Sequence, residues 1–154
     1  MELWGAKIPD NCAEATTEKP FQEWIGKYLR DWLDRNYQGF YRVKIEPQGG
    51  KVVPVRAFET SFWPDVSVES ADGEPLVAIE LKCLKRKGLP ALVSQALGQA
   101  LMYQQVYPQS LVVLVPMQPL AMPPPPFFAN LAEHEIEVTV VGSVSGAGIT
   151  ADAP

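Results

Sequence analysis

The chain has 154 residues, of which 47% are hydrophobic and 20% are charged, and its formal net charge is −5. This length and composition are typical of one globular domain with a hydrophobic core, and they exclude a chain that is disordered throughout. The acidic balance argues against broad binding of nucleic acid, which relies on a basic surface. However, all 13 Lys and Arg residues lie at or before Lys87. Any polyanion must therefore be bound by the first part of the chain.

Cysteine content and hydropathy narrow the class of protein further. The chain has Cys12 and Cys83 and no secretion signal at its start, which favours free thiols in a reducing cytoplasm. Its longest apolar run, around residues 111–115, is too short to cross a bilayer, so we expect no membrane association. A single His and the lack of a C-x-x-C motif argue against a zinc site.

The first predicted element is a helix. Residues 1–15 show no clear period, and we expect them to form an N-terminal arm. Over residues 20–36, apolar side chains recur at intervals of three and four, which predicts an amphipathic helix with one apolar stripe. The stripe consists of Phe21, Trp24, Ile25, Tyr28, Leu29, Trp32 and Leu33. We expect it to pack in the core, and the alternative is an aromatic platform on which bases stack.

Extended segments follow the helix. Residues 40–46 alternate between apolar and polar side chains, as a half-buried strand does, and residues 47–50 have the composition of a turn. Residues 51–60 are expected to be extended, at a sheet edge or irregular, because Pro54 cannot donate a hydrogen bond to a neighbouring strand.

A hairpin is predicted next, with strands at residues 64–69 and 76–84. The Asp72-Gly73 pair between the two strands favours a tight turn.

This hairpin carries three charged side chains at positions that should be half buried: Asp65, Glu80 and Lys82. Side chains alternate faces along a strand, so Glu80 and Lys82 share one face, and burying them without partners is costly. Two carboxylates and the carbonyl of Leu81 are suitable ligands for a hard divalent cation. A lysine beside them would stabilise negative charge on a phosphate. The alternative is a structural ion pair between Lys82 and a carboxylate.

The chain carries two motifs that resemble those of the PD-(D/E)XK nuclease superfamily. Pro64-Asp65 is followed after fourteen residues by Glu80-Leu81-Lys82, which resembles the motif that names the superfamily. Downstream, Gln99 and Tyr103 resemble the Q-x-x-x-Y motif of its RecB-like and lambda-exonuclease-like branch. The resemblance covers residues 18–141 approximately. The chain departs from that branch in having Glu-x-Lys where Asp-x-Lys is frequent.

The resemblance implies a restriction-endonuclease-like core and hydrolysis of phosphodiester bonds in DNA with Mg²⁺ or Mn²⁺. It implies that Asp65, Glu80 and Leu81 bind the metal. It also implies that Lys82 and Gln99 take part in catalysis together with the two carboxylates.

Many members of the superfamily carry a further metal-binding glutamate on the first helix. Glu23 is the better match by position, and Glu18 is the second candidate. Helical geometry directs Glu23 away from the apolar stripe. A solvated Glu23, paired with Lys27 one turn later, is therefore the alternative.

The densest basic cluster directly follows the hairpin and consists of Lys85, Arg86 and Lys87. We expect it to contact substrate phosphates, and the alternative is a solvated basic turn.

A second helix is predicted for residues 89–106, and its apolar residues predict that it is well buried. Gln95, Gln99 and Tyr103 are spaced by four, so they lie along one side of this helix. Buried amides need partners, which are either the backbone and each other or, as the resemblance implies, metal-bound water and substrate. Gln95 and Tyr103 are the expected substrate contacts.

The rest of the chain predicts a buried strand, a proline-rich loop, a short helix, a last strand and a flexible tail. These elements are expected at residues 111–116, 117–126, 127–133, 136–141 and 142–154.

The order of elements predicts an α/β fold with a mixed central β-sheet flanked by helices, in one domain over residues 1–154. The expected function is that of a metal-dependent deoxyribonuclease, which acts alone, as a homodimer or with a partner protein. The alternative is a catalytically inactive module of the same fold for nucleic-acid binding or protein assembly. A plain interaction protein with accidental motifs is the third possibility.

Overall fold

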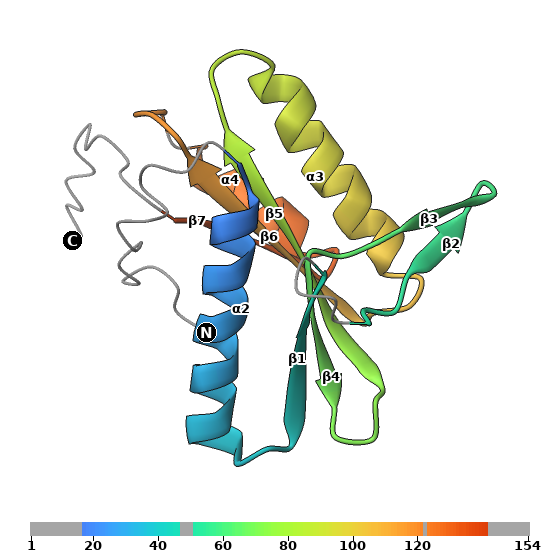
Figure 1. Ribbon diagram of the computed structural model, residues 1–154. Coiled ribbons are helices and arrows are strands. Elements are labelled where there is room, and N and C mark those ends of the chain that lie inside the picture. The colour runs from blue at the N-terminus through green and yellow to red at the C-terminus, as the bar shows by residue number, and fades with distance from the viewer. Residues whose placement is uncertain (1–16, 47–50, 122, 142–154) are drawn as a thin grey trace, which may run out of the picture.

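The architecture is a mixed α/β fold built on a five-stranded sheet. The computed structural model describes residues 17–46, 51–121 and 123–141. The sheet has the order β1-β4-β5-β6-β7, in which the β1-β4 and β4-β5 pairs are antiparallel and the β5-β6 and β6-β7 pairs are parallel (Figure 1). Its strands are β1 (Tyr41–Ile45), β4 (Val66–Ser70), β5 (Pro75–Leu84), β6 (Gln109–Pro116) and β7 (Ile136–Val140). The mixed sheet flanked by helices is therefore confirmed.

Helices cover both faces of the sheet. Helix α2 (Lys19–Tyr37) packs on one face, and helices α3 (Leu89–Tyr103) and α4 (Pro125–Ala132) pack on the other (Figure 1). Each side of the sheet therefore carries a hydrophobic core, which is a three-layer arrangement, and a third, smaller cluster contains Val55, Ala78, Tyr103 and Tyr107. In the described ranges, no helix is both long and apolar enough to cross a membrane.

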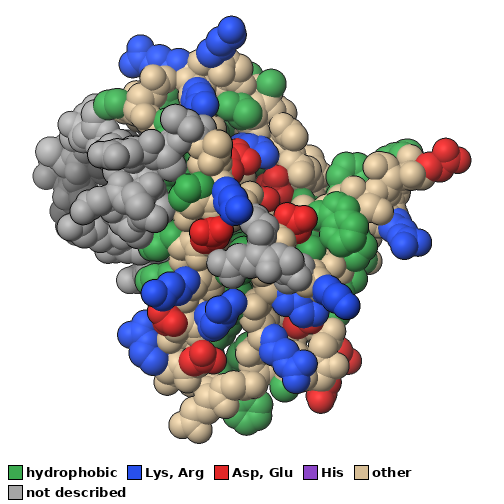
Figure 2. Space-filling view, in the orientation of Figure 1, with side chains coloured by type: hydrophobic (Ala, Val, Ile, Leu, Met, Phe, Trp, Pro, Cys, Tyr) green, Lys and Arg blue, Asp and Glu red, His purple; other side chains and the backbone are tan. Residues whose placement is uncertain are grey.

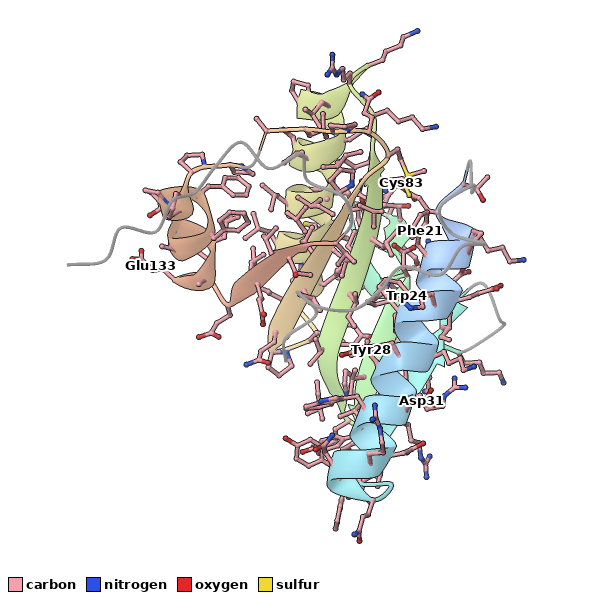
Figure 3. All side chains as sticks on the ribbon, turned by 90° about the vertical axis from the view of Figure 1, so that its left-hand side faces the viewer. Phe21, Trp24, Tyr28, Asp31, Cys83 and Glu133 are labelled. Atoms are coloured by element: carbon pink, nitrogen blue, oxygen red, sulfur yellow. The ribbon has the colours of Figure 1, made fainter. Side chains whose placement is uncertain are left out.

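The apolar stripe of α2 packs in the core, as the sequence predicts. Phe21, Ile25 and Leu29 are each at most 2% exposed and contact strand residues of the first core. The larger aromatic side chains on this stripe, including Trp24 and Tyr28, are partly buried against the same core (Figure 3). The stripe therefore packs in the core through Phe21, Ile25 and Leu29, whereas Trp24, Tyr28 and Trp32 are half-buried.

Side chains along β5 alternate between the two faces of the sheet, as expected. Ile79 and Leu81 belong to the core beneath α2, whereas Leu84 belongs to the core beneath α3 and α4. Glu80 and Lys82 project to the same side as Leu84, because residues two apart in a strand share a face.

Residues 51–57 are irregular and then extended, as expected, but a turn at Phe58 and Glu59 interrupts the segment expected to reach residue 60 and produces a β-ribbon. Strands β2 (Val55–Ala57) and β3 (Thr60–Phe62) pair antiparallel. Phe58 and Glu59 connect them with positive φ angles of 50° and 62°. Such a turn normally uses Asn and Gly, so the sequence carried no turn signal here. The ribbon projects from the body of the molecule beside α3 (Figure 1).

Several helices and strands begin or end at other residues than the sequence predicts. The first hairpin strand begins at Val66 instead of residue 64, because pairing with β5 starts at the Val66–Ile79 pair. Helix α4 begins at Pro125, within the predicted proline-rich loop, since proline is tolerated in the first turn of a helix. The predicted arm, the turn at residues 47–50 and the tail lie outside the described residues.

Helix α3 is less buried than predicted and ends at Tyr103 instead of residue 106. Only one side of it covers the sheet, through Ala96, Ala100 and Tyr103. Leu101 on another side is 53% exposed. An apolar sequence alone does not reveal how many faces of a helix are covered.

Candidate functional site

The site lies where β5 continues beyond its neighbour β4. The last residue pair between these strands is Val66 with Ile79, whereas β5 stays paired with β6 up to Leu84. Among the described residues, no strand pairs with this edge of β5 from residue 80 onward, and its backbone N–H groups need other acceptors.

Two carboxylates supply these acceptors. Asp65, directly before β4, accepts a hydrogen bond at Oδ2 from the N–H of Leu81, at 2.8 Å. Glu18, directly before α2, accepts one at Oε1 from the N–H of Cys83, at 3.1 Å. Two acidic side chains that are far apart in the chain therefore bind backbone N–H groups only two residues apart on this edge of β5.

Gln22 holds the second oxygen of Asp65. Its Nε2 donates a hydrogen bond to Asp65 Oδ1 at 2.6 Å, and its side chain lies on α2 with the residue only 8% exposed. Gln22 is not among the site residues predicted from the sequence. Its spacing of four from Glu18, which places the two on one side of the helix, was the available signal.

Glu80 and Lys82 form an ion pair on the face of β5 that α3 covers. Lys82 Nζ lies 3.3 Å from Glu80 Oε1 and 3.6 Å from Glu18 Oε2. Glu80 is 3% exposed and Lys82 is 9% exposed. Because buried charges are costly unless they are paired, this mutual pairing is required for both residues to be charged here.

Tyr103 links α3 to Glu80. Its hydroxyl lies 2.7 Å from Glu80 Oε2 and 2.9 Å from the backbone carbonyl of Trp63, and it donates its proton to one of these acceptors at a time. The same hydroxyl accepts a hydrogen bond from Gln99 Nε2 at 3.4 Å. Gln99 therefore reaches Glu80 through Tyr103, whereas Gln95, one turn earlier, is exposed.

Burial and mutual repulsion shift the protonation of the carboxylates. Burial, and then the charge of Glu80, raise the pKa of Asp65 to about 7, although the Leu81 N–H and Lys82 oppose this shift. Burial also raises the pKa of Glu80 against the hydrogen bond from Tyr103 and the charge of Lys82. These electrostatic effects require that Asp65, Glu80 and Lys82 lie close together.

Lys82 and Tyr103 stay in their ordinary protonation states at neutral pH. Burial acts to lower the pKa of Lys82, but the charges of Glu80 and Glu18 outweigh it, so the net shift is upward. Burial, and then the charge of Glu80, raise the pKa of the Tyr103 hydroxyl. Lys82 is therefore a fixed cation, and Tyr103 is a neutral hydrogen-bonding group.

Of the two helix glutamates, Glu18 is the one that contacts these residues. Glu23 is half-buried and has no hydrogen bond or ion pair to Asp65, Glu80 or Lys82. Five residues along a helix correspond to a rotation of about 140° beyond one full turn, so the two glutamates point in different directions. The preference for Glu23 in the sequence analysis is therefore corrected in favour of Glu18.

The donor atoms fit a hard divalent cation. The site offers the carboxylates of Asp65 and Glu80, and the Leu81 carbonyl points to the same edge of β5 as the Leu81 N–H. Asp65 has both oxygens in hydrogen bonds, but each oxygen retains a further lone pair. Within the described ranges, no three or more His, Cys, Asp or Glu side chains are grouped to hold a metal. An ion here would keep several waters, as Mg²⁺ does.

The surface around the site is unevenly charged. In Figure 2, acidic side chains gather near the middle of the face that carries α2, and Lys and Arg side chains lie on both sides of them. The basic cluster of Lys85, Arg86 and Lys87 is exposed and follows β5 directly.

A cavity of about 750 Å³ lies elsewhere, beneath the C-terminal half of α2. Apolar side chains such as Trp32, Leu111 and Ile136 line it, and none of Glu18, Asp65, Glu80 or Lys82 does. This cavity and the charged group are therefore separate features of the molecule.

Comparison of the chain with protein-family models, with curated proteins and with solved structures finds no match.

Proposed function

We propose that this chain is a metal-dependent nuclease with a restriction-endonuclease-like core, which hydrolyses phosphodiester bonds in DNA with Mg²⁺ or Mn²⁺. The observation that carries the proposal is the meeting of Asp65, Glu80 and Lys82 at the end of β5 that extends past β4. These residues occupy the order and spacing of the nuclease motif in the sequence. A pair of buried carboxylates with raised pKa beside a lysine is also typical of functional sites.

In this proposal, Asp65, Glu80 and the Leu81 carbonyl would hold the cation. The bound ion would make a coordinated water more acidic and offset charge on the phosphate. Lys82 stays protonated beside the carboxylates, so its role is to stabilise negative charge on the phosphate and not to accept a proton.

Neighbouring side chains keep the carboxylates in place. Gln22 fixes Asp65 and Tyr103 fixes Glu80, each through one hydrogen bond shorter than 2.8 Å. Gln99 acts on Glu80 only through the Tyr103 hydroxyl, so we assign both as positioning residues. Substrate phosphates would be bound by Lys85, Arg86 and Lys87, and Gln95 is left as an exposed contact one turn from Gln99 on α3.

A cleavage assay on single-stranded, double-stranded and branched DNA tests the proposal. We expect cleavage with Mg²⁺ or Mn²⁺ and none with EDTA. Asp65→Asn and Glu80→Gln should each lower the rate by roughly 100-fold or more, since both remove a charged metal ligand. Matched controls are Asp72→Asn in the exposed β4–β5 turn and Glu133→Gln after α4, far from α2 (Figure 3). Unchanged cleavage by both site variants would refute the proposal.

One observation favours the alternative of an inactive module. The carboxylates of Asp65 and Glu18 cap the open edge of β5, which is a structural task that needs no chemistry. The net charge of −5 also suits a protein-binding module. Under this alternative, the wild-type protein would bind DNA or a partner protein without metal-dependent cleavage, and divalent cations would leave its melting temperature unchanged.

A further inference from the structure

Trp63 is an exposed aromatic residue fixed beside the charged group. It connects β3 to the start of β4, and it is 49% exposed. Large aromatic side chains are usually well buried, so half-exposure of a tryptophan is informative. The next residue, Pro64, is buried and restricts the backbone of Trp63 to extended conformations.

Hydrogen bonds tie the backbone of Trp63 to the site. Its carbonyl lies 2.9 Å from the Tyr103 hydroxyl, which also lies 2.7 Å from Glu80 Oε2. The Tyr103 hydroxyl thus lies within hydrogen-bond distance of both the Trp63 carbonyl and Glu80, and Trp63 is two residues from Asp65. In Figure 2, hydrophobic side chains lie next to the acidic group at the root of the projecting ribbon. The backbone is held in place while half of the side chain remains available to a ligand.

We infer that Trp63 stacks on an unpaired base next to the phosphate that binds beside the proposed metal ligands Asp65 and Glu80, so that the site takes single-stranded DNA. The inference rests on the proposed nuclease function. In a duplex, neighbouring bases cover the faces of each base, whereas an unpaired base offers a face to an aromatic side chain.

Binding measurements on a cleavage-deficient Lys82→Ala background test this inference. The probes are a fluorescent oligothymidylate and a duplex of equal length, each with Mg²⁺. Trp63→Ala should weaken binding to the single strand by roughly 5- to 150-fold, the range expected for loss of one stacking contact, and Trp63→Phe should restore most of it. The matched control is Phe58→Ala, which removes an 88% exposed aromatic side chain from the tip of the same ribbon.

The outcomes separate this inference from the function on which it rests. Loss of single-strand affinity in Trp63→Ala alone, with duplex affinity within twofold of the parent, supports stacking. Equal losses for both probes, or no loss, overturn the inference while leaving the nuclease proposal intact. If the parent protein binds neither probe and the wild type cleaves neither, the proposed function fails and this inference fails with it.

Discussion

The carboxylate of Asp65 lies 2.8 Å from the backbone nitrogen of Leu81, sixteen residues further along the chain. Asp65 therefore stands where the carbonyl of a neighbouring strand would otherwise accept this hydrogen bond. The same side chain serves the fold as an edge cap and, in the proposed function, the metal as a ligand. Substitution by an amide keeps the shape of the side chain, so it tests the role of Asp65 as a metal ligand better than substitution by alanine does.

Stability of the metal-free protein should fall as pH rises. The pKa of Asp65 is about 7 in the folded chain, against its usual value of 3.8. Between these values the folded state binds more protons than the unfolded state. The stability that the raised pKa of Asp65 contributes is therefore complete below pH 4 and is lost as the pH rises through 7. The contribution of Asp65 alone amounts to at most about 4 kcal/mol. Urea unfolding in EDTA from pH 4 to pH 8 measures it.

Asp65→Asn should flatten this pH dependence, because the substituted side chain does not titrate. Asp72→Asn, in the exposed turn between β4 and β5, should keep the wild-type slope. Identical slopes in all three proteins would show that Asp65 titrates normally.

Divalent cations should raise the melting temperature, and more so at pH 8 than at pH 6. A ligand that binds only the folded state stabilises it, and protons on Asp65 and Glu80 compete with a metal. Thermal unfolding with and without Mg²⁺ or Mn²⁺ measures the shift. Asp65→Asn and Glu80→Gln should abolish it, whereas Glu133→Gln should retain it. A shift that survives both site substitutions places the metal elsewhere.

Lys82→Ala should abolish cleavage while the protein remains folded and still binds metal. The lysine is assigned to charge stabilisation in the chemical step, so its loss should appear in kcat. We expect a decrease of roughly 100-fold or more. Single-turnover cleavage with saturating DNA makes the measurement, and circular dichroism checks the fold. Lys85→Ala is the matched control, and it should change KM more than kcat. Turnover of the Lys82 variant at the wild-type rate would exclude this role.

The basic cluster should anchor phosphates without selecting sequence. Replacing Lys85, Arg86 and Lys87 by alanine should weaken binding to all sequences about equally, since phosphate contacts position the protein and do not specify bases. Each lost phosphate contact lowers the salt dependence by about 0.7 to 0.9 in a double-logarithmic plot. Salt titrations of the triple variant and its parent, both cleavage-deficient, measure this change. If the salt-dependence slopes of the triple variant and its parent coincide, the cluster is a solvated turn. Phosphates are then bound by other basic residues, such as Lys27, Arg30, Arg42 or Lys44.

Alanine substitutions at two helix glycines should change the stability of the protein in opposite directions. A Cβ at Gly26 in α2 would overlap the side chain of Ile45, whereas one at Gly98 in α3 would meet no atom within 4 Å. Gly26→Ala should therefore destabilise the protein by about 1–3 kcal/mol through overpacking. Gly98→Ala should stabilise it by up to about 1 kcal/mol, because alanine is the better helix former. Chemical unfolding measures both, and equal effects would contradict the packing of α2 on β1.

The sequence by itself determined the features that depend on local periodicity. The stripe of α2 repeats at three and four residues, and its buried face follows directly from that period. Alternation along β5 likewise separates Glu80 and Lys82 from Ile79 and Leu81, whatever the rest of the chain does. These patterns were sufficient for the mixed α/β class and for the candidate pair of Glu80 and Lys82.

The tertiary structure decided which distant side chains complete the site. Pairing of β4 with β5 ends at Val66, and along the rest of that edge the N–H groups of Leu81 and Cys83 donate to Asp65 and Glu18 instead of to a strand. The contact between Glu18 and Cys83 spans 65 residues of sequence, a separation over which no local pattern carries information. The ribbon turn at Phe58 and Glu59 was likewise beyond local sequence patterns, because the positive φ angles of both residues oppose their own backbone preferences.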